Sequence, residues 1–197
     1  MLKKITISLI IFSAVAAIVF GSYLPFRKSQ LFIKSFRGLG SMEQFDFDKF
    51  RSGFDQALDF YSPVGQSEEV RFLGNQILEL MQRKPPENTR EALKSYAVNN
   101  FEGTKGKWLS LNYTQNFLIL GAIHQAAWSE SKSQEDLDKT IYYFEEGLKL
   151  SPERAQFLFG LFELYRWANR NADAEKVIRK IAELWPSSVT EQPKTAN

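Results

Sequence analysis

The sequence predicts an all-α protein that begins with a transmembrane helix, and three observations support this prediction. Twenty uncharged residues, ITISLIIFSAVAAIVFGSYL from Ile5 to Leu24, follow the short basic start MLKK. From residue 29 onward, apolar residues recur every three or four positions, which is the period of an amphipathic α-helix. Clusters of proline, glycine and serine divide this helical pattern into segments.

The uncharged run from Ile5 to Leu24 has the length of a helix that crosses a bilayer. We expect an uncleaved membrane anchor. A secretory signal peptide is one alternative, because small residues precede a cleavage site ahead of Ser22. A buried globular helix is the other, although such a helix normally has a polar face.

Basic residues flank both ends of the anchor, which makes its orientation hard to read. The charge count alone favours a cytoplasmic domain, but a very short basic head is typical of a chain whose bulk is exported. We therefore expect an extracytoplasmic domain. We interpret the basic cluster after the anchor as solvated charge, with binding to anionic lipid headgroups as the alternative. The flanking residues are Lys3 and Lys4 on one side, and Arg27, Lys28, Lys34 and Arg37 on the other.

The breaks in the helical pattern delimit about eight helices after the anchor. We expect serine caps at three helix starts, Ser67, Ser133 and Ser151, the last with Pro152 in the first turn. The expected domains are the anchor with its basic flank (1–28), a helical domain (29–186) and a disordered tail (187–197). The breaks fall at 38–41, 62–65, 84–86, 103–107, 129–134, 151–152 and 169–171.

Segments of the helical domain share two residue spacings. First helices of successive pairs carry Val70-x2-Leu73-Gly74-x2-Ile77, Phe117-x2-Leu120-Gly121-x2-His124 and Leu158-x2-Leu161-Phe162-x2-Tyr165. Second helices carry Phe50-x3-Phe54-x2-Ala57, Ala92-x3-Tyr96-x2-Asn99, Thr140-x3-Phe144-x2-Gly147 and Ala174-x3-Ile178-x2-Ile181.

This pattern resembles the tetratricopeptide repeat (TPR) over about residues 29–186. The resemblance implies a right-handed solenoid of about four antiparallel helix pairs, in which a small residue lets two helices approach and large apolar residues fill the space to the next pair. The order of anchor, basic stretch and repeats is also similar to the C-terminal repeat extension of bacterial O-antigen ligase-type membrane proteins. That similarity implies a setting in cell-envelope glycan assembly.

The composition excludes several kinds of chemistry. The chain has no cysteine and one histidine, which removes disulfides, thiolate metal sites and cysteine nucleophiles. The formal net charge is only +2, so nucleic acid is not an expected partner. We expect no catalytic residue, no cofactor and no metal.

The remaining motifs are interpreted as structural features without a chemical role. We expect His124 to be a core residue, because it takes a position that packs between paired helices in the repeat family. The segment 103–107, GTKGK, is too short for a phosphate-binding loop, and the Asn112 glycan triplet is attributed to chance. Acid pairs such as Glu68-Glu69, Asp136-Asp138 and Glu145-Glu146 are interpreted as solvated charge.

Two surfaces are candidate binding sites. Ser13, Ala17 and Gly21 recur every four residues and form a small-residue ridge for association of two membrane helices. In the repeat family the first helices line a concave groove for partner peptides, and we expect Phe159, Arg166 and Trp167 to be its anchors. The full set of predicted groove residues is Arg71, Asn75, Leu78, Gln115, Leu118, Gln125, Phe159, Glu163, Arg166 and Trp167.

The sequence therefore predicts a membrane-anchored, non-enzymatic TPR-like scaffold that binds a protein or peptide. One alternative is an accessory component of cell-envelope glycan assembly, of the O-antigen ligase or polymerase type. The other is an enzyme such as a hydrolase, against which the single histidine and the absent cysteine argue.

Overall fold

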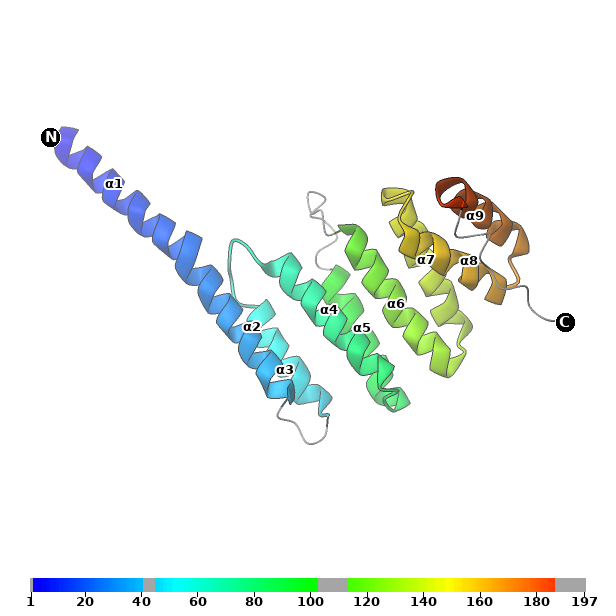
Figure 1. The fold of residues 1–197 in the computed structure, drawn as a ribbon. Helices are drawn as coiled ribbons and strands as arrows, with labels where there is room; N and C mark the ends of the chain where they lie inside the picture. Colours follow the sequence, from blue (N-terminus) through cyan, green and yellow to red (C-terminus); the bar gives the residue numbers. More distant parts are fainter. Residues whose placement is uncertain (1, 41–44, 103–112, 187–197) are drawn as a thin grey trace. The chain divides into compact units, whose positions relative to one another are not determined.

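The computed structural model describes residues 2–40, 45–102 and 113–186, and all regular structure in these residues is helical. The chain divides into two compact units, Met1–Leu73 and Gly74–Asn197, and each is described by itself. The division falls inside α4 (Gln66–Gln82). The prediction of an all-α protein is confirmed (Figure 1).

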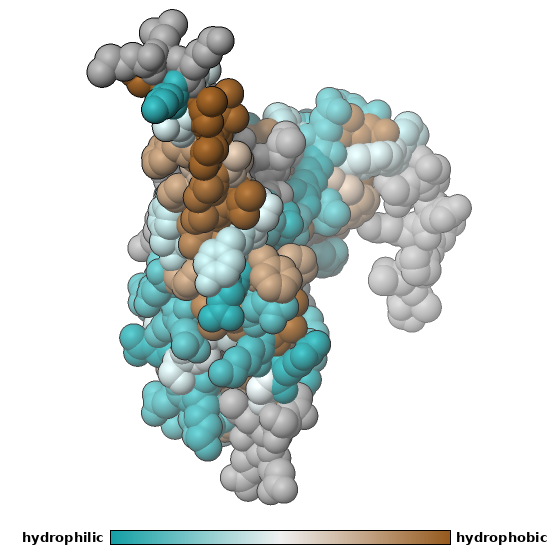
Figure 2. Space-filling view, turned by 90° about the vertical axis from the view of Figure 1, so that its left-hand side faces the viewer, coloured by the Kyte–Doolittle hydropathy of each residue, from teal (hydrophilic) through white to brown (hydrophobic). Residues whose placement is uncertain are grey.

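Unit 1 begins with a continuous helical run made of α1 (Leu2–Ile18), a π turn η1 (Val19–Tyr23) and α2 (Leu24–Gly40). In the π turn the N–H of Leu24 donates to the carbonyl of Val19, five residues back. Pro25 follows directly, and because proline lacks an N–H and crowds the preceding turn, it accounts for the wider turn here. The run contains one stretch, Lys4–Leu39, long and apolar enough to cross a membrane, as the sequence predicts. Hydrophobic side chains gather along this helix (Figure 2).

The rest of unit 1 comprises α3 (Phe47–Leu58) and the first half of α4. Asp46 caps α3, because its carboxylate accepts from the N–H groups of Asp48 and Lys49. α2 packs against α3 through phenylalanine rings; Phe32, for example, meets Phe54 edge-on at 5.3 Å between ring centroids. The core phenylalanines of this unit are Phe32, Phe50 and Phe54.

Unit 2 holds the end of α4 and the helices α5 (Glu87–Glu102), α6 (Tyr113–Ser131), α7 (Gln134–Leu150), α8 (Ala155–Trp167) and α9 (Asn171–Leu184). From α5 to α9 each helix packs against the next along the chain. An apolar cluster is built from α7, α8 and α9. Its buried members are Leu137, Ile141, Phe144, Phe157, Leu158, Leu161, Leu164, Tyr165, Ala174, Val177 and Ile181.

Glycines let the helices of unit 2 approach closely. A methyl group added at Gly121 of α6 or at Gly160 of α8 would overlap the ring of Phe144 of α7. A methyl group at Gly147 would overlap the ring of Phe157 in the same way. Phe144 therefore lies against two helices whose glycines leave room for its ring.

The helix ends agree with most of the predicted breaks but not with all the predicted caps. Lys84, Lys132 and Asn169 have positive φ values of 54°, 55° and 56°, which is the left-handed conformation that ends a helix. Ser133 precedes α7, but its hydroxyl makes no capping hydrogen bond. Ser151 ends α7 without starting α8, since Arg154 is the residue before α8 and Pro152 lies in the turn between them. The predicted caps at Ser151 and, inside α4, at Ser67 are therefore wrong.

Candidate functional site

All predicted groove residues except Arg71 belong to unit 2. Arg71 is half-buried in unit 1, with its guanidinium 5.9 Å from the ring centroid of Phe72. In unit 2, Leu78 and Gln125 line the same open pocket of about 440 Å³, and Asn75 is exposed one turn before Leu78. The structure therefore brings two of the predicted residues together.

Gln115 and Leu118 of α6 are partly engaged within the unit. The side-chain oxygen of Gln115 accepts a hydrogen bond from the guanidinium of Arg154, in the turn before α8. Leu118 is half-buried and packs against the apolar cluster of α7, α8 and α9. Gln115 and Leu118 therefore expose less surface to a partner than side chains on a fully solvated helix face would.

Trp167 is the most exposed aromatic side chain of unit 2 among the described residues. It ends α8 with 67% of its surface accessible, and its ring meets Trp128 of α6 edge-on, 5.8 Å between centroids. The ammonium of Lys132 lies 5.0 Å from the centroid of Trp128. These three residues form an aromatic and basic surface, which we call the Trp167 surface.

The other predicted anchors on α8 lie differently. Phe159 is 41% exposed and stacks on Trp185, with 6.0 Å between centroids. Arg166 and Glu163 are exposed, and the guanidinium of Arg166 lies 5.6 Å from the centroid of Phe162. Phe159 and Trp167 therefore belong to separate aromatic pairs.

Trp128, Lys132 and Trp185 were not predicted from the sequence to be surface residues. Trp128 comes seven residues after the buried Gly121, two helical turns along the same face, so this spacing indicated packing and gave no signal of exposure. Trp128 lies next to the predicted break at 129–134, and Lys132 lies inside it. The helical pattern was therefore not followed to the end of α6 at Ser131.

His124 is buried in unit 2 and belongs to an ionic cluster, which we call the Asp136 cluster. Its Nδ1 lies 3.0 Å from Oδ1 of Asp136, and the ammonium of Lys94 donates to the same oxygen at 2.8 Å. Among the described residues, the Nε2 atom of His124 has no hydrogen-bond partner. The prediction that His124 is a core residue is confirmed.

The titration behaviour of this cluster follows from its burial. Burial lowers the pKa of His124 below its ordinary 6.5, although the hydrogen bond to Asp136 opposes the shift. Burial alone would lower the pKa of Lys94, but its hydrogen bonds to Asp136 and Glu91 raise it. The prediction of solvated charge is wrong for Asp136, whose side chain is only 3% exposed.

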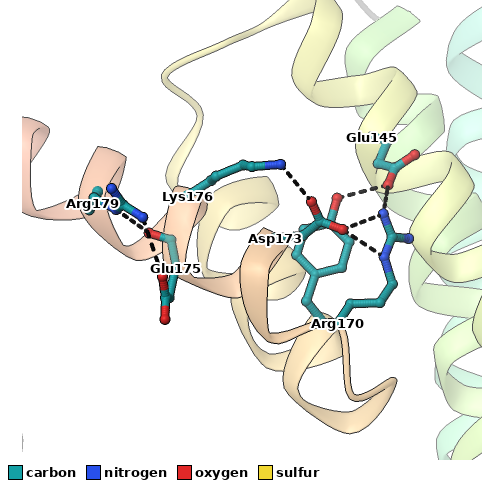
Figure 3. Close-up of polar contacts among 7 residues, drawn as sticks. Glu145, Arg170, Asp173, Glu175, Lys176 and Arg179 are labelled. Carbon is teal, nitrogen blue, oxygen red and sulfur yellow. Dashed lines mark hydrogen bonds and ion pairs between the residues drawn. The ribbon is translucent and has the colours of Figure 1, made fainter.

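A second polar cluster ties α7, α8 and α9 together. The hydroxyl of Tyr165 donates to Glu145 at 2.7 Å, and Arg170 lies 3.4 Å from Glu145 and 2.9 Å from Asp173. Figure 3 shows Arg170 between the two carboxylates. Burial, together with the hydrogen bond to Glu145, raises the pKa of Tyr165, so its hydroxyl remains a donor at neutral pH.

Unit 1 contains a buried lysine, and both sequence interpretations of Lys28 are therefore wrong. Its ammonium donates to the carbonyls of Ala57 (3.1 Å), Leu58 (3.2 Å) and Phe60 (2.8 Å) at the end of α3. It also donates to Oε1 of Gln66 at 2.6 Å and lies 3.4 Å from a carboxylate oxygen of Glu69. We call these residues the Lys28 cluster.

Glu69 was predicted to be solvated and is instead buried. Burial raises its pKa above the ordinary 4.5, although Lys28 opposes the shift. Helix-end carbonyls attract a cation because the helix dipole is negative there, so the end of α3 helps to hold Lys28. This arrangement is structural, since Lys28 and Glu69 are both buried away from solvent.

The membrane-helix ridge and two smaller motifs complete the predicted features. Ser13, Ala17 and Gly21 are exposed, and the π turn that begins at Val19 interrupts the α-helical period between Ala17 and Gly21. The segment 103–107, Asn112 and the tail 187–197 lie outside the described residues. Within the described residues, no group of three or more His, Asp or Glu side chains could hold a metal ion.

Comparisons with models of known protein families, with curated proteins and with solved structures find no match.

Proposed function

We propose that this chain is a membrane-anchored, non-enzymatic scaffold whose TPR-like helical repeats bind a protein or peptide. The observation that carries the proposal is the Trp167 surface of unit 2. A tryptophan with 67% of its surface in water lies next to a second tryptophan and a lysine, and tryptophan is one of the residues enriched in interaction hot spots.

The close approach of helices at glycine supports the repeat part of the proposal. Gly121 and Phe144 take the small and large positions of one antiparallel pair, and Gly160 receives the same phenylalanine from the next helix. Gly74 also lies close to an aromatic ring, because a methyl group there would come within 2.5 Å of the ring of Phe101. Close approach of helices at small residues in successive segments supports stacked repeats.

The apolar N-terminal helix supports the anchor. The window of Lys4–Leu39 that fits a membrane span has a mean hydropathy of 2.3 and buries none of its residues inside the protein. We place the helical domain on the extracytoplasmic side of the membrane. If protease added to intact cells leaves this domain uncleaved, the placement is wrong. Association of two anchors through Ser13, Ala17 and Gly21 stays a prediction.

The environment of the single histidine supports a binding role over an enzymatic one. An acid-base catalyst must reach a substrate proton, whereas His124 is 6% exposed and its Nδ1 is paired with Asp136. The polar clusters around Asp136, Tyr165 and Lys28 join helices to one another.

The test is capture of partners from native membranes by the full-length chain, comparing wild type with Trp167→Ala plus Arg166→Ala. We expect the free energy of binding to the captured protein to become weaker by at least ~2 kcal/mol, which is the typical effect of truncating a hot-spot residue. Both side chains are exposed, so the melting temperature should change little.

The matched control is Glu175→Ala plus Arg179→Ala, an exposed ion pair of α9 shown in Figure 3. It removes the same number of surface side chains and should leave capture unchanged. If the tryptophan variant captures its partner as well as wild type does, the Trp167 surface is not the binding site.

A further inference from the structure

The loop that joins α3 to α4 in unit 1, residues 59–65, exposes large apolar side chains. Tyr61 is 67% exposed and Val64 is 61% exposed. The eight residues from Phe60 to Ser67 carry no charge. The loop also satisfies part of its own backbone, because the hydroxyl of Ser62 donates to the carbonyl of Val64 at 2.7 Å.

The Lys28 cluster fixes where this loop lies along the membrane-anchor helix. Lys28 comes four residues after Leu24, the end of the uncharged run, or about 6 Å further along the axis at about 1.5 Å per residue. Its ammonium donates to the carbonyls of Leu58 and Phe60, the residues that lead into the loop. In Figure 1 the loop rises alongside α2 toward the N-terminal part of the long helix.

A second contact gives the direction of α3. Ser35, about two turns beyond Lys28 on α2, donates to the carbonyl of Gly53 at 2.6 Å, whereas Lys28 meets Ala57 and Leu58. The C-terminal end of α3 is therefore nearer to the apolar span than its N-terminal end. The loop, which follows that end, is brought toward the span.

We propose that the 59–65 loop is a second membrane contact, with Tyr61 and Val64 inserted into the lipid interface of the bilayer that holds the anchor. The inference rests on the membrane anchor of the proposed function. The headgroup layer is about 5–7 Å thick on each side of the hydrocarbon core, so a loop held at the level of Lys28 lies within it.

The chemistry of the neighbouring helix end fits the same layer. Phe20, Tyr23 and Phe26 are exposed around the end of the uncharged run, and aromatic side chains are enriched at membrane interfaces. Tyr61 continues this aromatic belt from a different element. Arg27, also exposed, extends toward the headgroups, and the one charge of the loop, Asp59, lies at its start, before the uncharged residues that begin at Phe60.

The test uses single cysteines, which the cysteine-free chain allows without other changes. The full chain is reconstituted into vesicles of phosphatidylcholine and phosphatidylglycerol with a fluorescent label at Val64→Cys. Phe20→Cys, inside the span, and Lys49→Cys, exposed on α3 and further from the span, are the reference positions. Quenchers carried by lipid or dissolved in water then report the depth of each label.

We expect lipid-borne quenching of the Val64 label to resemble that of the Phe20 label more than that of the Lys49 label. A Val64 label quenched only from water, with the Phe20 label quenched from lipid, overturns the inference and leaves the anchor intact. Quenching of the Phe20 label from water overturns the anchor and the inference together. A Val64 label shielded from both quenchers indicates cover by a second copy of the chain and overturns the inference.

A companion measurement excludes insertion driven by the dye. With the label moved to Tyr61→Cys, the substitution Val64→Asp should shift its quenching to the level of the Lys49 label, because a carboxylate is costly to dehydrate. If Val64→Asp leaves the depth of the label unchanged, the dye and not the loop is responsible, and the inference fails.

Discussion

The two units of this chain each hold a lysine ammonium in a polar cluster, but in different ways. In unit 1, the ammonium of Lys28 is held largely by neutral oxygens, those of three backbone carbonyls and of Gln66. In unit 2, Lys94 and His124 share one charged oxygen, that of Asp136. The difference means that Lys28 depends on the fold of α3, whereas His124 depends on the side chain of Asp136 and Lys94 on those of Asp136 and Glu91.

The largest expected effect is the loss of the cation in unit 1. Lys28→Met keeps the length of the side chain but leaves the carboxylate of Glu69 buried without a counter-ion, which typically costs about 3–5 kcal/mol. Hydrogen exchange of the α3 amides in the full chain, in detergent micelles, measures the loss. Lys34→Met, an exposed change on the same helix, is the control, and equal protection in the two variants would contradict the structural role of Lys28.

The second effect tests the dependence of unit 2 on Asp136. Asp136→Asn removes the charge that pairs with Lys94 and His124, and we expect a loss of about 1.5–3 kcal/mol, the size of a hydrogen bond to a charged group. All four tryptophans lie at position 108 or beyond, so the change in tryptophan fluorescence on unfolding in urea reports unit 2. Asp138→Asn, exposed on the same helix, should stay within about 0.5 kcal/mol of wild type.

The two clusters should also respond to acid with opposite signs. The pKa of His124 is lowered on folding, so its contribution to stability is complete above its ordinary pKa of 6.5 and is lost as the pH falls below it. The pKa of Glu69 is raised on folding, so its ionisation lowers the stability of unit 1 as the pH rises above 4.5.

The pH prediction is checked by urea unfolding followed by tryptophan fluorescence between pH 7 and pH 5. The stability of unit 2 should fall on acidification, and His124→Phe should flatten that part of the dependence. An unchanged slope in the His124 variant would mean that another group controls the acid response. The positive charges of Lys94 and Lys139 act on His124 in the same direction as its burial and also lower its pKa.

The sequence predicted the helices better than the contacts between them. Proline, glycine and serine act locally, so the breaks near Pro85, Gly65 and Pro152 could be located without tertiary information. The cap at Asp46 was missed, although an aspartate before an amphipathic segment is a local signal. The cap predicted at Ser151 failed because three further residues form a turn before α8 begins.

The buried charges could not be predicted, because their partners are distant in sequence. Lys28 and the carbonyl of Phe60 are 32 residues apart, and Lys94 and Asp136 are 42 apart. A lysine in a basic cluster and an aspartate at a helix start have the same local pattern whether they are solvated or paired. At the candidate binding surface, the exposure of Trp167 followed from helical periodicity, whereas its contact with Trp128 depends on how α8 lies against α6.

The smallest expected effect concerns the membrane helix. Ala17→Ile with Gly21→Ile should abolish any self-association of the anchor in a membrane reporter assay, because bulky side chains prevent close backbone contact. Ala14→Ile with Ile18→Val, outside the ridge, is the control. The same signal in both variants would leave the small-residue ridge without a role and would fit the interruption of its period by the π turn.

The most direct test of the proposed scaffold is photo-crosslinking in native membranes with a photoreactive residue at position 167 of the full chain. We expect a discrete adduct of higher mass from position 167 and none from position 175, where Glu175 is exposed on α9. The absence of an adduct at 167, or the same adduct from both positions, would contradict the assignment of a partner to the Trp167 surface.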